Sequence, residues 1–232
     1  MSASLAEVSA LFAERRSCRG FLGKPVPQPL LAEILETAQR TASWCNSQPW
    51  QVIVTYGEAT EGFRNALYAH AASEAPGEPD FAFPREYRGT YRDRRRDAGY
   101  RLYEAVGIGR EDAVGRARQS LENFRLFGAP HVAIISSDEA LGPYGAVDCG
   151  GYVANFLMAA QAAGIATIPQ AAFAYHSPFV RQYFNLGEDR RIVCGISFGY
   201  PDPDHPANTV VTDRASLPDA VTIIGGNNCY YK

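Results

Sequence analysis

Apolar side chains recur every three or four residues in several stretches of this chain, which is the pattern of an amphipathic helix. In residues 5–14, for example, Leu5, Val8 and Leu11 share one face with Phe12. Residues 30–40 repeat this pattern after a turn that is rich in proline. Further helices are predicted at residues 58–73, 92–106, 111–124 and 144–163.

Short apolar runs between these stretches predict β-strands at residues 51–55, 132–135, 165–168 and 191–199. Helices and strands therefore alternate, which indicates an α/β or an α+β architecture around a central sheet, and the pattern alone does not separate the two. Residues 75–90 are rich in proline, glycine and charge, so we predict a mobile surface loop there. The core elements resume after this loop, which favours a single domain over residues 1–232.

Composition narrows the possible functions. An apolar content of 46 % in 232 residues is ample for a packed core. The formal charge of −3 and the pI near 5.8 give no overall attraction to nucleic acid. Arginines at residues 92–96 are interleaved with Asp93 and Asp97. We interpret them as a solvated helix face, with contact to an anion as the alternative.

The cysteines and histidines exclude further classes. The five cysteines are scattered, with no Cys-x-x-Cys pair and no secretory leader, so we expect reduced thiols in a cytoplasmic protein. The four histidines are too dispersed for a recognisable metal motif. No apolar run approaches the roughly 18 residues that a membrane span needs. We therefore expect no metal, no membrane and no nucleic acid as a partner.

Two polar segments carry candidate chemistry. Residues 14–21 contain Arg15, Arg16, Ser17 and Arg19, whose forked donors and hydroxyl suit a phosphate. Residues 42–50 form a loop rich in hydrogen-bonding groups, held rigid by its proline before an apolar strand. On its own, the loop at residues 42–50 is also ordinary turn chemistry before a strand. Together they suggest a phosphorylated, planar cofactor.

At this point the sequence resembles the FMN-dependent nitroreductases. The motifs RRSCRGF, ASWCNSQPW, IPQAAF and TDRASLP recur in that family in the same order, over roughly residues 8 to 221. The motifs NFRLFGAP and GISFGYPDPDHP resemble its nitrobenzoate-reductase-like branch. The resemblance implies an α+β nitroreductase-like fold, a mixed central sheet flanked by helices, and an intertwined homodimer with one FMN at each subunit boundary.

The resemblance also assigns the residues that bind the flavin phosphate. Arg15, Ser17 and Arg19 correspond to family ligands, with Arg16 beside them, and Arg214 matches a late arginine that closes the site. The family often has a second cation two residues before this arginine, where the chain has Thr212. Arg16 or Arg19 would then replace this second late cation.

Other positions correspond to the flavin ring. By resemblance, Ser43, Trp44 and Asn46 reach the ring from the partner subunit, Gln48 keeps their loop rigid, and Cys45 is interpreted as a small buried filler. The segment Pro169, Gln170, Ala171 and Ala172 would run past the ring, where many relatives have Glu-Gly in place of the two alanines. Asn123 matches a residue at the pyrimidine edge. Asp148 is either a polar neighbour of the flavin or a helix-packing residue paired with the backbone or an arginine.

The resemblance implies a ping-pong NAD(P)H oxidoreductase that reduces nitroaromatics, quinones or similar planar oxidants through flavin N5. NADH and NADPH are not distinguished. Other chemistry on the same fold (enone reduction, dehalogenation or flavin fragmentation) and a non-catalytic flavin-binding protein are the alternatives. Residues 75–110 would be an insertion over the substrate site, and residues 222–232 a C-terminal tail.

Overall fold

The computed structural model describes residues 4–224 of the chain. Its helices are α1 (Leu5–Glu14), α2 (Gln28–Ala38), α3 (Glu58–Ala72), α4 (Gly89–Ala105), α5 (Ala113–Leu121), α6 (Gly142–Ala162), α7 (Ser177–Tyr183) and α8 (Leu217–Ala220). The strands are β1 (Gln51–Thr55), β2 (His131–Asp138), β3 (Ala166–Gln170) and β4 (Arg190–Gly199). Short 3₁₀ turns are η1 (Trp44–Asn46), η2 (Leu126–Gly128), η3 (Glu139–Leu141), η4 (Ala171–His176) and η5 (Pro206–Thr209).

The strands form one sheet in the order β1-β2-β4-β3, and each of its three ladders is antiparallel. The α+β class is therefore confirmed. The expected mixed sheet is corrected in detail, because parallel pairing within residues 4–224 is limited to the isolated bridge between Ser17 and Thr167. Hydrophobic patterning reports which face of a strand is buried and carries no information on strand direction.

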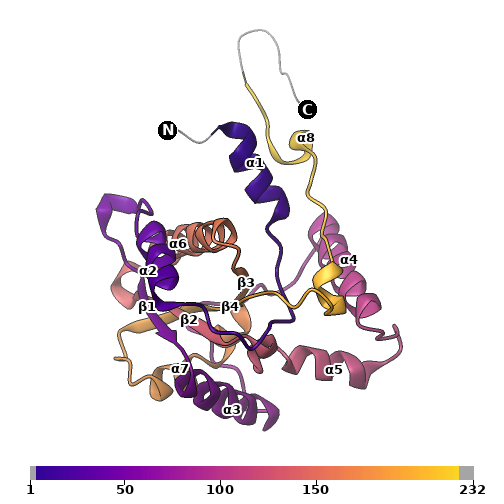
Figure 1. Ribbon diagram of the computed structural model, residues 1–232, viewed down its shortest axis with the longest axis horizontal. Helices are drawn as coiled ribbons and strands as arrows, with labels where there is room; N and C mark the ends of the chain where they lie inside the picture. The colour runs from indigo at the N-terminus through magenta and orange to yellow at the C-terminus, as the bar shows by residue number, and fades with distance from the viewer. Residues whose placement is uncertain (1–3, 225–232) are drawn as a thin grey trace.

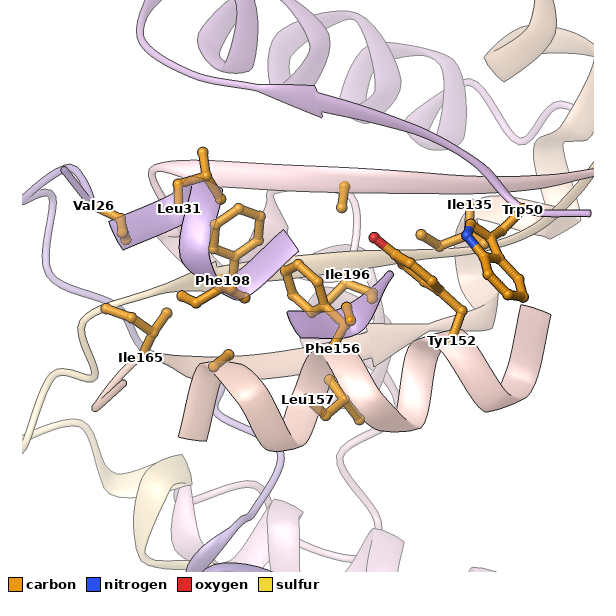
Figure 2. Close-up of a cluster of buried hydrophobic side chains, with 14 of the residues drawn as sticks. Val26, Leu31, Trp50, Ile135, Tyr152, Phe156, Leu157, Ile165, Ile196 and Phe198 are labelled. Carbon is orange, nitrogen blue, oxygen red and sulfur yellow. The ribbon is translucent and has the colours of Figure 1, made fainter. Parts of the chain in front are cut away.

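Helices cover both faces of the sheet (Figure 1), with α2 and α6 on one side and α3 and α7 on the other. Successive residues of β2 alternate between the two cores, because side chains alternate across a strand. Ile135 belongs to the core that contains Phe156 of α6 and Trp50 (Figure 2), whereas Ile134 belongs to the core that contains Phe63 of α3. Burial on both faces explains why β2 reads as an unbroken apolar run.

Helix α1 projects beyond the sheet (Figure 1) and contacts α6. It begins with a capping box, in which the Ser4 side chain accepts from the Glu7 backbone and the Glu7 carboxylate accepts from the Ser4 backbone. None of its residues is buried. An amphipathic helix with an exposed apolar face needs a surface to pack against.

The segment between α3 and α4 is anchored at one buried carboxylate. The Asp80 side chain is only 4 % exposed and forms an ion pair with Arg181 of α7. It also accepts a hydrogen bond of 2.7 Å from the backbone N–H of Ile192 on β4. The sequence predicts a loop that does not bury itself, so this anchor is a correction. The mobility of residues 75–90 stays a prediction.

Several element boundaries differ from those predicted. Helix α4 begins earlier, at Gly89, and α5 ends at Leu121 rather than at residue 124. The sequence pattern did not indicate the short helix α7 or the 3₁₀ turns. Most of the predicted tail at residues 222–232 lies outside the described residues.

Candidate functional site

The basic segment and the late arginine meet in one cavity. This basic cavity has a volume of about 340 Å³. It is lined by Phe12, Ala13, Glu14, Arg15, Arg16, Ser17, Arg19, Ala98, Val210, Val211, Thr212 and Arg214. All the residues predicted to bind a phosphate are among them, although they come from opposite ends of the chain.

Backbone pairing fixes the position of the basic segment. The Cys18 N–H donates to the Thr167 carbonyl of β3 at 3.0 Å, next to the bridge between Ser17 and Thr167. The Arg19 N–H donates to the Asn208 side-chain oxygen at 2.7 Å. A Cβ at Gly20 would lie 2.2 Å from the His205 ring, so only glycine allows this close approach.

The electrostatics of the basic cavity favour an anion. Burial lowers the pKa of Arg15, and the nearby charge of Arg214 lowers it further. Burial also lowers the pKa of Arg19. Within residues 4–224 neither these arginines nor Arg16 forms an ion pair with a carboxylate, although Glu14 lines the same cavity. A phosphate between them would relieve the mutual repulsion and supply the missing partner.

Thr212 has a role that the sequence left in doubt. Nη1 of Arg214 donates to the Thr212 hydroxyl at 2.9 Å and to its carbonyl at 3.0 Å. Both residues line the basic cavity. Thr212 therefore helps to orient the Arg214 side chain at the edge of the basic cavity.

The end of β3 leads from the basic segment to the predicted ring-binding segment. The Gln170 amide is buried, donates to the Asn123 carbonyl at 2.8 Å, and accepts from the Ser197 hydroxyl at 2.5 Å. This side chain is fully used inside the protein, so any contact of this segment with a ligand falls to its backbone and to the exposed neighbours Pro169 and Ala171. Asn123 joins the same cluster, through its carbonyl and its side chain.

A glycine on β4 positions the segment after β3. Gly195 pairs with Gln170 in the sheet, and a Cβ at this glycine would lie 1.9 Å from the Phe173 ring. Phe173 is fully buried in the core beside α3. The missing side chain therefore lets η4 pack down on the sheet, which holds residues 169–172 at its edge.

The loop at residues 43–48 does not line the basic cavity. Cys45, Asn46 and Gln48 have left-handed φ values of 52°, 55° and 46°, and the Gln48 N–H donates to the Ser43 hydroxyl at 2.9 Å. Gln48 also donates through its side chain to the Asn46 side-chain oxygen at 3.1 Å. Cys45 is exposed, which corrects its interpretation as a buried filler.

Asp148 of α6 holds this loop. Its carboxylate oxygens accept from the Trp44 N–H at 3.2 and 3.1 Å, as the helix-packing alternative predicts. Trp44 also meets Tyr144 edge to face, with ring centroids 4.7 Å apart. The loop and α6 line a cavity of about 280 Å³ that shares no lining residue with the basic cavity. One chain thus keeps the predicted phosphate residues and the predicted loop apart.

In the part of the chain that the structure describes, the other titratable groups do not form a second reactive centre. Burial raises the pKa of Cys149 to about 11 and that of Cys194 to about 12, so these thiols stay protonated. Cys18, Cys45, Cys149 and Cys194 are free thiols. Among residues 4–224, no group of His, Cys, Asp and Glu side chains is arranged to hold a metal, and no helix is both long and apolar enough to span a membrane.

Comparison with known proteins defines the class. Residues 12–200 match the nitroreductase family. The chain is 32 % identical over 208 residues to 4-nitrobenzoate reductase of Pseudomonas putida, which covers 90 % of this chain and 91 % of that protein. It is 35 % identical over 212 residues to nitroreductase NfnB of Mycolicibacterium smegmatis, over 90 % and 89 % of the two chains.

A solved structure agrees in fold. The crystal structure of the FMN-dependent nitroreductase NfnB from Mycobacterium smegmatis, in complex with NADPH, has a TM-score of 0.90 and 33 % identity. The match covers 96 % of this chain and 100 % of that chain. The fold and the matches together define an α+β oxidoreductase. The chain belongs to the nitroreductase family and resembles its nitrobenzoate-reductase-like branch, which confirms the resemblance seen in the motifs.

Proposed function

We propose that this protein is an FMN-dependent NAD(P)H oxidoreductase that reduces nitroaromatic compounds, and that the basic cavity binds the FMN phosphate. The observation that carries the proposal is the pair Arg15 and Arg214. Both cations face one cavity, and neither has a carboxylate partner within residues 4–224. Burial of Arg15 lowers its pKa, and the charge of Arg214 lowers it further. The likeness to 4-nitrobenzoate reductase of Pseudomonas putida supports the same reaction.

The residues of the site fit a flavin mononucleotide. Arg15, Ser17, Arg19 and Arg214 would hold the phosphate through charge-assisted hydrogen bonds, with Arg16 as a further cation. When bound, FMN supplies the redox chemistry that no side chain provides, by taking electrons from a reduced nicotinamide and passing them to an oxidant. The protein contributes position, charge and exclusion of water.

The segment at the end of β3 would lie along the ring. The small side chains of Ala171 and Ala172 leave room for a flat group, and Pro169 stiffens the approach. Because the Gln170 side chain is used by Asn123 and Ser197, the backbone N–H groups here are the donors for the ring. A backbone donor aimed at a ring nitrogen stabilises the electron density of the reduced state.

We also propose that the protein is a homodimer in which each site takes its 43–48 loop from the partner subunit. Helix α1 has no buried residue, and large apolar side chains stand exposed along α1, α6 and the C-terminal segment. The most exposed on these three elements include Leu5, Phe12, Tyr144, Val147 and Ile224, and Trp44 of η1 stands exposed beside Tyr144. A second copy of the chain would cover this surface and bring Ser43, Trp44 and Asn46 to the basic cavity.

Residues 75–110 stay proposed as the cover of the substrate site, since α4 supplies Ala98 to the basic cavity. Small planar aromatic compounds or quinones would enter beneath them. The free thiols suit a reducing compartment, and we place the protein in the cytoplasm.

A mixed dimer tests the shared site. One chain carries Arg15→Ala and the other Asn46→Ala, so both changes fall in one site and the second site is intact. We expect about half of the normal FMN to bind tightly. Two equally weakened sites would show that each pocket is built within one subunit.

The reaction itself is tested by identifying the released chromophore and by following NADPH oxidation with and without 4-nitrobenzoate. We expect FMN at about one per subunit, because no Gly-x-Gly-x-x-Gly element exists for a dinucleotide pyrophosphate. Recovery of FAD, or NADPH oxidation that 4-nitrobenzoate does not accelerate, would overturn the proposed function.

A further inference from the structure

A second cavity, lined by tyrosines and arginines, lies at the connection between α4 and α5. It has a volume of about 500 Å³. It is lined by Tyr100, Tyr103, Glu104, Ile108, Gly109, Arg110 and Arg116. We call it the Tyr–Arg cavity. None of the residues assigned above to FMN belongs to it.

The arginines of the Tyr–Arg cavity lack acidic partners. Within residues 4–224, neither Arg110 nor Arg116 forms an ion pair with a carboxylate. Arg101 on the same helix α4 differs, because it is neutralised by Asp97 at 2.8 Å and by Asp213. The positive charge of Arg110 and Arg116 is therefore available to an anion in this cavity.

Local contacts hold these cations in place. Nη1 of Arg116 donates to the carbonyl of Arg110, and the Arg110 guanidinium lies 4.8 Å from the centre of the Tyr100 ring. Arg96 donates to the Tyr100 hydroxyl at 3.3 Å. This hydrogen bond and the nearby charges of Arg96, Arg110 and Arg116 lower the pKa of Tyr100. Three guanidinium groups therefore lie near the Tyr100 ring, against the one carboxylate of Glu104 in the lining, and this excess of positive charge favours an anion there.

The remaining lining groups complement a nucleotide. Tyr100 and Tyr103 offer flat rings for a base, and the carboxylate of Glu104 is an acceptor for a sugar hydroxyl or a base amino group. The arginines suit a phosphate monoester, since the guanidinium fork matches its oxygens. Base, sugar hydroxyl and phosphate monoester occur together in the 2′-phosphoadenosine half of NADPH.

The Tyr–Arg cavity connects with the basic cavity through one intermediate hollow. Ile108 lines both the Tyr–Arg cavity and this hollow, which has a volume of about 500 Å³. Arg19 lines both the hollow and the basic cavity. Arg118 also faces the hollow. Asp112 and Glu122 line the hollow as well, so its charge is mixed, and the unpaired cations lie at its two ends, at Arg19 and at Arg110 and Arg116.

We propose that the Tyr–Arg cavity binds the adenosine 2′-phosphate of NADPH, through Arg110 and Arg116, and makes the enzyme selective for NADPH over NADH. This inference rests on the proposed function, because it supplies the reductant of the same site. It gives α4 and α5 a second task beside covering the substrate. It also decides between two nucleotides that the motifs leave equal.

Binding and kinetics of the FMN-loaded protein test this assignment. The variants are Arg110→Ala, Arg116→Ala and the double variant, and the control is Arg94→Ala. Arg94 lies on α4 and lines none of the cavities described here. The probes for binding are 2′,5′-ADP and 5′-AMP, measured by calorimetry. KM is measured for NADPH and for NADH.

We expect each single variant to raise the KM for NADPH about threefold to tenfold, a range reduced for the exposure of the site. The double variant should raise it further, with a smaller change in the KM for NADH. Binding of 2′,5′-ADP should weaken in parallel, and 5′-AMP should bind weakly to every variant. Arg94→Ala should leave both nucleotides unaffected.

An equal shift for NADPH and NADH, or 2′,5′-ADP binding that the double variant does not weaken, would overturn the assignment. In those cases reduction of the flavin by either nucleotide would still support the proposed function. A protein that binds 2′,5′-ADP through these arginines, but whose flavin neither nucleotide reduces, would support the cavity and refute the reaction. The two failures are therefore distinguishable.

Discussion

Replacing Asp80 by alanine should destabilise the protein strongly, although the residue lies in a segment without helix or strand. The carboxylate is 4 % exposed and Arg181 is 12 % exposed. Nη1 of Arg181 donates to Asp80 at 2.6 Å, and the Ile192 N–H donates to it at 2.7 Å. Removing the carboxylate leaves a nearly buried cation and a backbone N–H without an acceptor.

The size of the effect follows from these contacts. Breaking one side of a buried ion pair costs about 3–5 kcal/mol. Arg191, at 3.5 Å, is partly exposed and contributes little. Some water can reach Arg181, so we expect Asp80→Ala to lower the free energy of unfolding by about 2–4 kcal/mol. Asp80→Asn keeps an acceptor for the backbone N–H and should cost less.

Urea denaturation of the FMN-saturated protein, at fixed protein concentration, measures this difference. Asp93→Ala is the matched control, because its carboxylate is 67 % exposed and lies 3.6 Å from Arg92. The control should change the free energy of unfolding by less than about 0.5 kcal/mol. Trypsin should also cut residues 73–88 faster in Asp80→Ala. A loss below about 0.5 kcal/mol with unchanged cleavage would refute the anchoring role.

Three further predictions test the site and its supports. Arg214→Ala should weaken FMN binding at least tenfold, measured by flavin fluorescence, whereas Arg94→Ala should not; equal effects would misplace the phosphate site. Burial lowers the pKa of His131 in the folded protein. As the pH falls below about 6.5, this histidine is protonated more readily in the unfolded chain, so the free energy of unfolding should decrease between pH 7 and pH 5. His131→Gln should flatten that decline in urea titrations at the two pH values, and an unchanged slope would contradict it. Gly195→Ala should cost about 1–3 kcal/mol by overpacking, against almost nothing for Gly23→Ala, whose Cβ would meet open space; similar thermal midpoints would refute the packing argument.

The sequence predicts the helices and strands whose own residues carry a clear hydrophobic pattern. Periodic helices such as α2 and α6, and the apolar strand β2, repeat a pattern over several residues, so the pattern outweighs single exceptions. The seven residues of α7 are too few for such a signal. The hydrophobic pattern also does not predict whether neighbouring strands are parallel or antiparallel, because that depends on which segments pair.

The site divides in the same way. Arg15 and Ser17 belong to one short motif whose donors suit a phosphate, so the motif predicts them directly. Thr212 contributes through its hydrogen bond with Arg214. Threonine is a common residue, and no sequence motif around it predicts this contact. Asp80 is hidden in a segment whose composition predicts exposure, because its partners Arg181 and Ile192 are distant in sequence. Contacts of this kind are set by tertiary packing.

Anaerobic titration of the purified protein tests the central claim most directly. We predict a yellow protein whose visible flavin absorbance is lost on addition of NADPH and is restored by 4-nitrobenzoate. The basic cavity must hold FMN for the colour, and the adjoining space must admit both reductant and oxidant for the two changes. A protein that takes up no FMN on reconstitution, or one whose bound flavin neither NADPH nor NADH bleaches, would contradict the proposed function.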